Sequence, residues 1–337
     1  MSANDSLHLL VNLPPTFFTH PQLQPYFDRL RRFASVRQRS HDTLEQILPE
    51  LPWTEALLMW AWPPLDETAL AQAPRLHFVS QLNTVQTTAR ACLKRGIALS
   101  EARHCWSPAV AEMALGLILS GLRKLSDYHT AMRHGQETWT ANFPADIDPL
   151  ERELTGRPVG IVGFGGIGRR LAELLAPFHG ELRVYDPYLP EEVIRQHGAT
   201  PAMLHELIEN SDVVVLAAAN NPEARHLIGR REIAAFRPHS LLVNVGRSML
   251  VDTPALVKRL ECGDLIAMLD VFDREPLELE SPLRKLPNAY LTPHRAGGLL
   301  VSVERALTML IEDLEAHLAG RPRHYAVDES MLPCFSG

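Results

Sequence analysis

The chain has 337 residues, which at the usual domain size corresponds to two domains rather than one. Hydrophobic residues make up 46% of it and charged residues 22%, so a sizeable core is available and wholesale disorder is excluded. The formal net charge of -7 disfavours nucleic acid as a partner, because chains that bind nucleic acid carry a basic excess.

The first residues and the cysteines bear on location and metal binding. The N-terminal residues lack a basic region followed by an apolar run, and the longest apolar stretch, residues 113–122, is too short to cross a bilayer. We therefore expect a cytoplasmic protein that makes no membrane contact. The 4 cysteines show no paired C-x-x-C spacing, so we expect neither a disulfide framework nor a metal site.

Short apolar runs and helical patterns alternate in the first third of the chain. Residues 7–11 and 76–79 are predicted to be strands, and residues 89–94 a helix. A longer helix is predicted to begin with Ser107 as its N-cap and to carry an apolar face as far as residue 122. Residues 126–150 lack a clean period, and we interpret them as an extended arm or loop that packs on its own domain or on a partner subunit.

Repeated strand–helix units begin at residue 157. Each predicted strand is a short, almost continuous apolar run, and the strands are 159–162, 182–185, 213–217, 241–245, 266–271 and 289–291. A last helix is predicted over residues 301–319. Strands of this kind are typical of a parallel sheet that is covered by helices on both faces.

A glycine-rich turn is the sharpest motif in the chain. It joins an apolar strand to an amphipathic helix, which is the context of a dinucleotide-binding turn, through Gly163, Gly165, Gly166, Ile167 and Gly168. Such glycines allow a tight turn, and the helix N-terminus offers N–H groups to a pyrophosphate. Asp186 ends the next strand, where its carboxylate can accept ribose hydroxyls and repel a 2′-phosphate, which favours NAD over NADP. Taken alone, the motif leaves a Rossmann methyltransferase or a flavin site open.

Three polar residues follow three later strands of the same half. Arg247 comes after residues 241–245, Glu275 after 266–271, and His294 after 289–291. The carboxyl ends of parallel strands share one edge of a sheet, so we expect these side chains to converge. Histidine can transfer a proton near neutral pH, a carboxylate stabilises its protonated form, and arginine can hold a carboxylate and polarise a carbonyl group.

At this point the chain resembles the D-2-hydroxyacid dehydrogenases, from about Ser107 to Asp328. The resemblance implies an α/β fold of two Rossmann-like or flavodoxin-like parallel-sheet domains. A substrate domain of residues 1–103 plus 299–337 would receive an inserted NAD-binding domain of residues 104–298, with a cleft between them. It further implies a homodimer that interconverts a small-molecule 2-oxo acid and its D-2-hydroxy acid with NAD.

The resemblance also implies roles for individual residues. Arg247, Glu275 and His294 would be catalytic, with His294 as the general acid and base. Asn83 and Thr84 would bind the substrate together with Arg247. Beside the glycine turn and Asp186, the cofactor would contact Asn221, Val245, Gly246, Asp270 and Gly297.

Several positions depart from the family pattern and keep alternatives open. The segment 80–86 lacks the glycines of the family's carboxylate-holding loop, Ser248 stands where a glycine commonly follows the arginine, and Arg295 follows the histidine. We expect a small 2-oxo acid such as glyoxylate, hydroxypyruvate, or a phenyl- or alkyl-substituted analogue. An NADH-sensing corepressor-like binding protein and a phosphite-type dehydrogenase of the same family are the alternatives.

Overall fold

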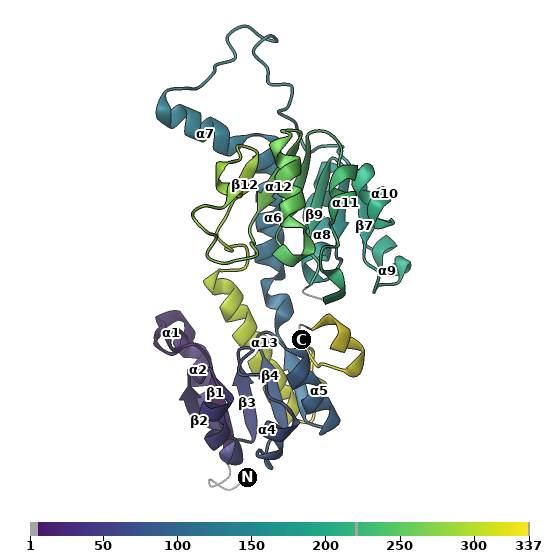
Figure 1. Cartoon of the computed structure of the whole chain (residues 1–337). Helices are drawn as coiled ribbons and strands as arrows, with labels where there is room; N and C mark the ends of the chain where they lie inside the picture. The colour runs from purple at the N-terminus through teal and green to yellow at the C-terminus, as the bar shows by residue number, and fades with distance from the viewer. Residues whose placement is uncertain (1–5, 220–221, 336–337) are drawn as a thin grey trace. The chain divides into compact units, whose positions relative to one another are not determined.

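A computed structural model of the chain describes residues 6–219 and 222–335, which form two compact units, each shown in Figure 1. Unit 1 comprises Met1–Cys105 and Leu300–Gly337, and unit 2 comprises Trp106–Leu299. Unit 1 is therefore discontinuous in sequence, because the chain leaves it after Cys105 and returns at Leu300. The sequence predicted these two domain boundaries between residues 103 and 104 and between residues 298 and 299.

Unit 1 is built on a five-stranded, all-parallel sheet. Its strand order is β2-β1-β3-β4-β5, with β1 (Leu7–Asn12), β2 (Ala34–Arg39), β3 (Ala56–Met59), β4 (Phe78–Gln81) and β5 (Ala98–Glu101). The helices of this unit are α1 (Pro15–Thr19), α2 (Gln24–Arg31), α3 (Leu44–Ile47), α4 (Glu67–Ala71), α5 (Gln86–Lys94) and α13 (Leu300–Leu318). Helices α2 and α13 contact each other and the sheet, and α5 packs on β5 together with the C-terminal turn η8 (Glu329–Cys334).

The register of this sheet explains which side chains it buries. Leu10, Leu57, Val79 and Leu99 are cross-strand partners, are fully buried, and belong to the same apolar cluster as the residues of α4 and α5. Two residues further on, the same face ends in a row of Asn12, Met59, Gln81 and Glu101. The apolar face of the sheet therefore becomes polar at the carboxyl ends of its strands.

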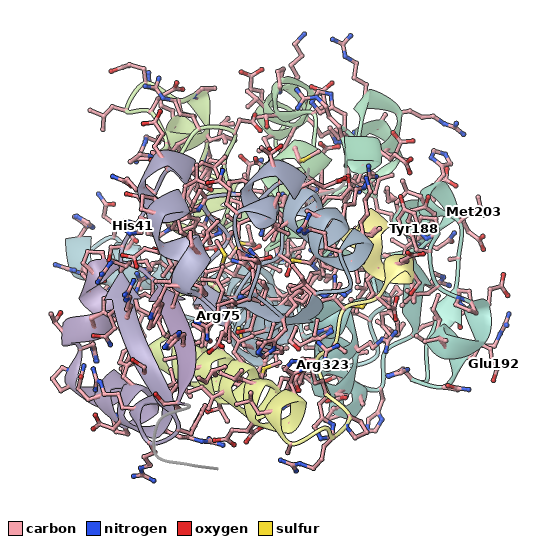
Figure 2. All side chains as sticks on the ribbon, turned by 90° about the horizontal axis from the view of Figure 1, so that it is seen from below. His41, Arg75, Tyr188, Glu192, Met203 and Arg323 are labelled. Atoms are coloured by element: carbon pink, nitrogen blue, oxygen red, sulfur yellow. The ribbon has the colours of Figure 1, made fainter. Side chains whose placement is uncertain are left out.

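A buried carboxylate ties the C-terminal segment to unit 1. Asp313 of α13 is fully buried and accepts hydrogen bonds from Ser100 Oγ at 2.7 Å, His324 N at 2.7 Å and Tyr325 N at 3.0 Å. Arg323, which Figure 2 labels, donates from Nη1 to the Leu99 carbonyl oxygen at 2.6 Å. These bonds hold the chain beside β5 after α13 ends.

Unit 2 is built on a seven-stranded, all-parallel sheet. Its order is β12-β11-β10-β9-β6-β7-β8, with β6 (Val159–Val162), β7 (Leu182–Tyr185), β8 (Thr200–Pro201), β9 (Val213–Leu216), β10 (Ser240–Asn244), β11 (Leu265–Leu269) and β12 (Ala289–Leu291). The chain builds outward in one direction from β6 to β8 and in the other from β9 to β12. In open parallel sheets, such a reversal creates the crevice in which ligands bind.

Helices cover both faces of this sheet. One buried cluster joins α6 (Ser107–Leu122) and α8 (Gly166–Leu175) to the sheet. A second cluster joins the opposite face to α10 (Leu204–Glu209), α11 (Arg230–Ala235) and α12 (Thr253–Glu261), while α9 (Glu191–Arg195) contacts β8. Together with its preceding turn, α6 is long and apolar enough to resemble a membrane span, but it packs on α8 and β10, which accounts for its apolar residues.

The two all-parallel sheets confirm the predicted fold class, and two local predictions are wrong. Residues 126–150 are not wholly an extended arm or loop, because α7 (Leu125–His134) occupies their first part. This helix buries none of its residues, so no apolar face revealed it in the sequence. Ser107 is not an N-cap either: it lies inside α6, and no side chain caps that helix. Strands β2, β3, β5 and β8 were not predicted.

Candidate active site

The glycine-rich turn joins β6 to α8 with very little space around it. Gly163 has a φ of +92°, and a Cβ there would lie 2.5 Å from the Ala218 Cα atom. A Cβ on Gly168 would lie 2.3 Å from the Gly163 carbonyl oxygen. These two positions therefore require glycine for the turn itself.

The N-terminus of α8 is open to a ligand. Gly165 precedes the helix and has nothing within 4 Å of the position that a Cβ would take. Its N-cap residue, Gly165, has no side chain that could cap the helix, so it leaves the backbone N–H groups of Gly166 and Ile167 at the first turn unoccupied. An uncapped helix N-terminus beside open space suits the pyrophosphate of a dinucleotide.

Asp186 stands at the end of β7, beside this turn. Its Oδ2 accepts a hydrogen bond from the Phe164 N–H at 2.8 Å, and its Oδ1 accepts one from the Tyr188 N–H at 3.0 Å. Each oxygen thus makes one bond that orients the carboxylate, and the remaining lone pairs can accept ribose hydroxyls. The turn and Asp186 together fit a dinucleotide that lacks a 2′-phosphate.

Glu275 and His294 meet at the carboxyl ends of β11 and β12. His294 Nδ1 lies 2.6 Å from Glu275 Oε2, and Glu275 Oε1 accepts a hydrogen bond from the Phe272 N–H at 3.0 Å. Because Nδ1 is committed to the carboxylate, Nε2 is the ring nitrogen that can face a reactant. The structure therefore brings these two predicted residues into direct contact.

Several charges act on the Glu275 carboxylate. Its partial burial would raise its pKa, but the hydrogen bonds from His294 and the Phe272 N–H lower it, and so do the charges of His294 and Arg247. The net effect holds the pKa of Glu275 below its ordinary value. Glu275 is consequently ionised at neutral pH and can stabilise a protonated His294.

Arg247 follows β10, the neighbouring strand, and is near enough to Glu275 for their charges to interact. Its Nη1 donates to the Gly246 carbonyl oxygen at 2.8 Å. Partial loss of water around the guanidinium lowers the pKa of Arg247, and the negative charge of Glu275 opposes that shift. The side chain remains solvent-accessible, so its other donors can meet an anionic ligand.

Asp270 holds the segment that carries His294. It is fully buried, and its Oδ1 accepts hydrogen bonds from Thr292 Oγ1 at 2.6 Å and from the Arg295 N–H at 2.9 Å. Its Oδ2 accepts a third from the Ala296 N–H at 2.9 Å. These donors flank His294, whose φ of 48° is unusual for a residue other than glycine. The sequence predicted Asp270 as a cofactor contact and did not predict this support of the histidine.

Asn244 is a second supporting residue, and it was not among the residues predicted from the sequence. Its Oδ1 accepts from the Gly246 N–H at 3.1 Å, and its Nδ2 donates to the Arg247 carbonyl oxygen at 3.1 Å. It thereby closes the turn that presents Arg247. An asparagine directly after an apolar strand is a turn signal that was available in the sequence.

The remaining predicted cofactor residues are placed as follows. Val245 is buried, and a Cβ on Gly246 would lie 3.0 Å from the Ala218 carbonyl oxygen, so this turn lies close to the end of β9. Gly297 is half-buried near Trp106. Asn221 lies outside the described residues.

Asn83 and Thr84, the predicted substrate residues, lie between β4 and α5 in unit 1. Thr84 is buried, Asn83 is half-buried, and the preceding Leu82 N–H donates to the Met59 carbonyl oxygen at 3.0 Å. Neither Asn83 nor Thr84 has a positive φ. The described non-glycine residues that do are Lys124, His179, His226, His239 and His294. The loop thus forms without glycine in ordinary backbone conformations.

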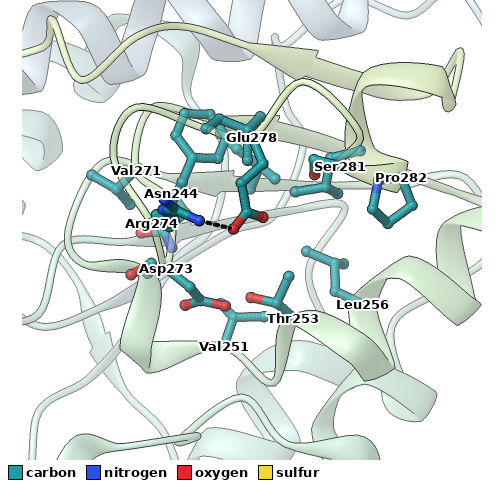
Figure 3. A pocket seen from close by; sticks show the side chains of 15 residues that line it. Asn244, Val251, Thr253, Leu256, Val271, Asp273, Arg274, Glu278, Ser281 and Pro282 are labelled. Carbon is teal, nitrogen blue, oxygen red and sulfur yellow. Dashed lines mark hydrogen bonds and ion pairs between the residues drawn. The ribbon is translucent and has the colours of Figure 1, made fainter.

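A pocket of about 280 Å³ lies between α12 and the segment that carries Glu275 (Figure 3). Leu256 and Thr253 line the pocket from α12, and Phe272 and Leu283 line it from the residues between β11 and β12. Arg274 Nη1 donates to Glu278 Oε1 at 2.9 Å, the contact that Figure 3 marks with a dashed line. Within the described residues, no group of three or more metal-ligating side chains was found.

Known proteins resemble this chain over most of its length. The model of the NAD-binding domain of D-isomer specific 2-hydroxyacid dehydrogenases matches residues 115–296. Glyoxylate reductase of Aeropyrum pernix is 32% identical over 283 residues, which cover 82% of this chain and 84% of that protein. Hydroxyphenylpyruvate reductase of Plectranthus scutellarioides is 32% identical over 323 residues, or 94% of this chain and 98% of that protein.

Solved structures and a longer relative extend the comparison. The structure of a 2-hydroxyacid dehydrogenase from Ketogulonicigenium vulgare Y25 is 26% identical with a TM-score of 0.78, and the match covers 96% of this chain and 99% of that one. D-3-phosphoglycerate dehydrogenase of Methanocaldococcus jannaschii is 27% identical over 94% of this chain, which spans only 59% of that protein.

Proposed function

Because the chain belongs to the family of D-isomer specific 2-hydroxyacid dehydrogenases, whose cofactor is NAD, we propose that it interconverts a 2-oxo acid and its D-2-hydroxy acid. The observation that carries this proposal is the 2.6 Å contact of His294 Nδ1 with Glu275 Oε2 at the carboxyl ends of adjacent strands. A histidine oriented by a carboxylate is suited to transfer a proton, and Arg247 follows the next strand along.

The residues divide the reaction between them. When bound, NADH supplies the hydride that reduces the carbonyl carbon of the 2-oxo acid. His294 donates the proton that the carbonyl oxygen needs, from Nε2, and takes it back in the reverse direction. Glu275 stabilises the protonated imidazole, while Arg247 holds the substrate carboxylate and polarises the carbonyl group.

The cofactor would be held by residues of unit 2. The pyrophosphate would bind at the N-terminus of α8, where Gly165 leaves open space and no side chain caps the helix. The Asp186 carboxylate would accept the ribose hydroxyls, which predicts a preference for NADH over NADPH. Asn83 and Thr84 of unit 1 would bind the substrate carboxylate through their backbone N–H groups.

The reaction is tested by NADH consumption with a panel of 2-oxo acids that includes glyoxylate, hydroxypyruvate, pyruvate and phenylpyruvate. Turnover by the wild type and a loss of at least about 10²-fold in kcat for His294→Ala support the proposal. The matched control is His205→Ala, which removes another histidine of unit 2, one that lies 3.4 Å from the carboxylate of Glu209. Absence of turnover with every acid, or equal losses in the two variants, would contradict the proposal.

We also propose that the arm, defined here as residues 125–150, pairs with a second copy of the chain. Figure 1 shows α7 and the loop after it projecting away from the sheet of unit 2. The arm exposes large apolar side chains, most of all Trp139 at 70% and Phe143 at 77%. Exposed apolar residues gathered on one segment are typical of an interface.

Sedimentation velocity tests this pairing. The wild type should sediment as a dimer, and Trp139→Asp combined with Phe143→Asp should give a monomer. As a control, Met203→Asp alters another exposed apolar residue of unit 2, at 71% exposure, and should remain dimeric. A monomeric wild type would refute the proposal.

A further inference from the structure

The polar row at the carboxyl end of the unit 1 sheet contains a buried side chain that has no partner in the described part of the chain. Gln81 lies between Met59 and Glu101 in register, so these three side chains emerge on the same face. Gln81 is fully buried, and within the described residues neither its Oε1 nor its Nε2 has a hydrogen-bond partner. Buried amides are nearly always hydrogen-bonded, so this amide calls for a partner that the described residues do not supply.

Asn12, at the other end of the row, shows that the unpaired state is local to Gln81. Asn12 is also buried, but its Nδ2 donates to the His41 carbonyl oxygen at 3.0 Å, and its Oδ1 accepts from the His41 N–H at 2.8 Å. The loop after β2 therefore satisfies Asn12. No equivalent group of the described chain reaches Gln81, which stands two strands further along the same edge.

Glu101 is the cross-strand neighbour of Gln81 and is only 4% exposed. Burial raises the pKa of Glu101 to about 7, against the opposing effects of Arg103 and of the Thr84 hydroxyl. Arg103 Nε lies 3.0 Å from Glu101 Oε1, and the Arg103 guanidinium stacks over the Phe335 ring at 5.2 Å. The arginine is thus held on one side of the carboxylate and compensates its charge.

The position of this pair connects it to the substrate. Gln81 is the last residue of β4, directly before the segment 82–84 that we propose binds the substrate carboxylate. The carboxyl edge of a parallel sheet is where open α/β domains bind ligands. A group that contacts Gln81 and Glu101 would belong to the part of the substrate beyond its carboxylate.

We infer that Gln81 and Glu101 form a polar subsite that binds a hydroxyl group on the side chain of the 2-oxo acid. The inference rests on the proposed function. A hydroxyl group donates one hydrogen bond and accepts two, which an amide and a carboxyl group together can satisfy. The Arg103 charge compensates Glu101, so the pair does not call for an ionic ligand. An alkyl or phenyl side chain would leave the Gln81 amide buried and unpaired.

Matched substrate pairs test the subsite. Hydroxypyruvate differs from pyruvate by one hydroxyl group, and 4-hydroxyphenylpyruvate differs from phenylpyruvate in the same way at a longer reach. We expect the wild type to favour the hydroxylated member of at least one pair by about tenfold or more in kcat/KM. Gln81→Met, which keeps the length of the side chain, should bring that ratio close to one, mainly by lowering kcat/KM for the hydroxylated acid. Glu101→Gln, which keeps a donor and an acceptor, should retain most of the preference.

A matched variant and a binding measurement separate the possible failures. Gln38→Met replaces another glutamine of the same sheet, on edge strand β2, and should leave the substrate ratios as in the wild type. Equal kcat/KM within both pairs, or a preference that survives Gln81→Met, would overturn the subsite while leaving the proposed function intact. If no acid is reduced, the proposed function fails. Calorimetric titration of the NADH-loaded protein then decides the subsite: tighter binding of a hydroxylated acid than of its parent supports it, and equal binding overturns it.

Discussion

Asp270→Asn should disorder the segment that carries His294 without changing the shape of the side chain. The wild-type carboxylate accepts three hydrogen bonds, from Thr292 Oγ1 and from the N–H groups of Arg295 and Ala296. An asparagine has one acceptor oxygen, so its NH₂ group must face at least one of these donors. The variant loses at least one hydrogen bond to a charged group and leaves buried donors unpaired.

The size of the effect follows from those bonds. A hydrogen bond to a charged group contributes about 1.5–3 kcal/mol, and an unpaired buried donor costs about 1–3 kcal/mol. We expect the variant to lose about 2–4 kcal/mol in the local opening free energy of residues 292–296. Amide exchange of Arg295 and Ala296 should then accelerate on the order of 10²-fold, because about 1.4 kcal/mol corresponds to a factor of ten.

Exchange and kinetics together make the measurement decisive. Hydrogen–deuterium exchange resolves the segment directly, and kcat should fall about 10²-fold because a shift of about 1 Å in a catalytic group has that effect. Thr292→Val removes only one of the three donors and should give a smaller change in both. Unchanged exchange at residues 295 and 296, with a loss confined to NADH affinity, would refute the view that Asp270 acts by supporting His294.

Three further predictions concern the cofactor turn and the pH dependence of stability. Asp186→Ser should weaken NADH binding and lower the ratio of the NADPH to the NADH dissociation constant at least about tenfold. Fluorescence titration with each cofactor measures this ratio, and an unchanged ratio would contradict the role assigned to Asp186. Gly168→Ala should lower stability by about 1–3 kcal/mol because its Cβ would lie 2.3 Å from the Gly163 carbonyl oxygen, whereas Gly165→Ala, which meets open space, should not. Because folding lowers the pKa of Glu275, its ionised carboxylate stabilises the folded state at pH values above the ordinary carboxyl pKa. This stabilisation is lost as the pH falls through the lowered pKa. Glu275→Gln should therefore flatten the fall in melting temperature below about pH 5, and an equally steep fall would contradict the assignment.

The amino-acid sequence alone was enough to predict the parallel α/β class, most strands of unit 2 and the glycine turn. Continuous apolar runs such as that of β9 (Val213–Leu216) can be buried only between two helical layers, and a turn as crowded as that at Gly163 excludes every side chain. These are local properties, which is why they could be predicted. The order of Arg247, Glu275 and His294 after successive strands predicted their convergence for the same reason, because parallel strands end at one edge.

Which groups support that convergence, and which have no partner among the described residues, became visible only once the strands were paired and the side chains packed. Nothing local to Asp270 shows that it accepts three hydrogen bonds from a segment more than 20 residues away, or that the exposed helix α7 would form without a buried face. Gln81 and Glu101 lie 20 residues apart in the chain and become neighbours only through the register of β4 and β5. Contacts of this kind depend on how strands pair and on what burial leaves unpaired, and a single sequence records neither directly.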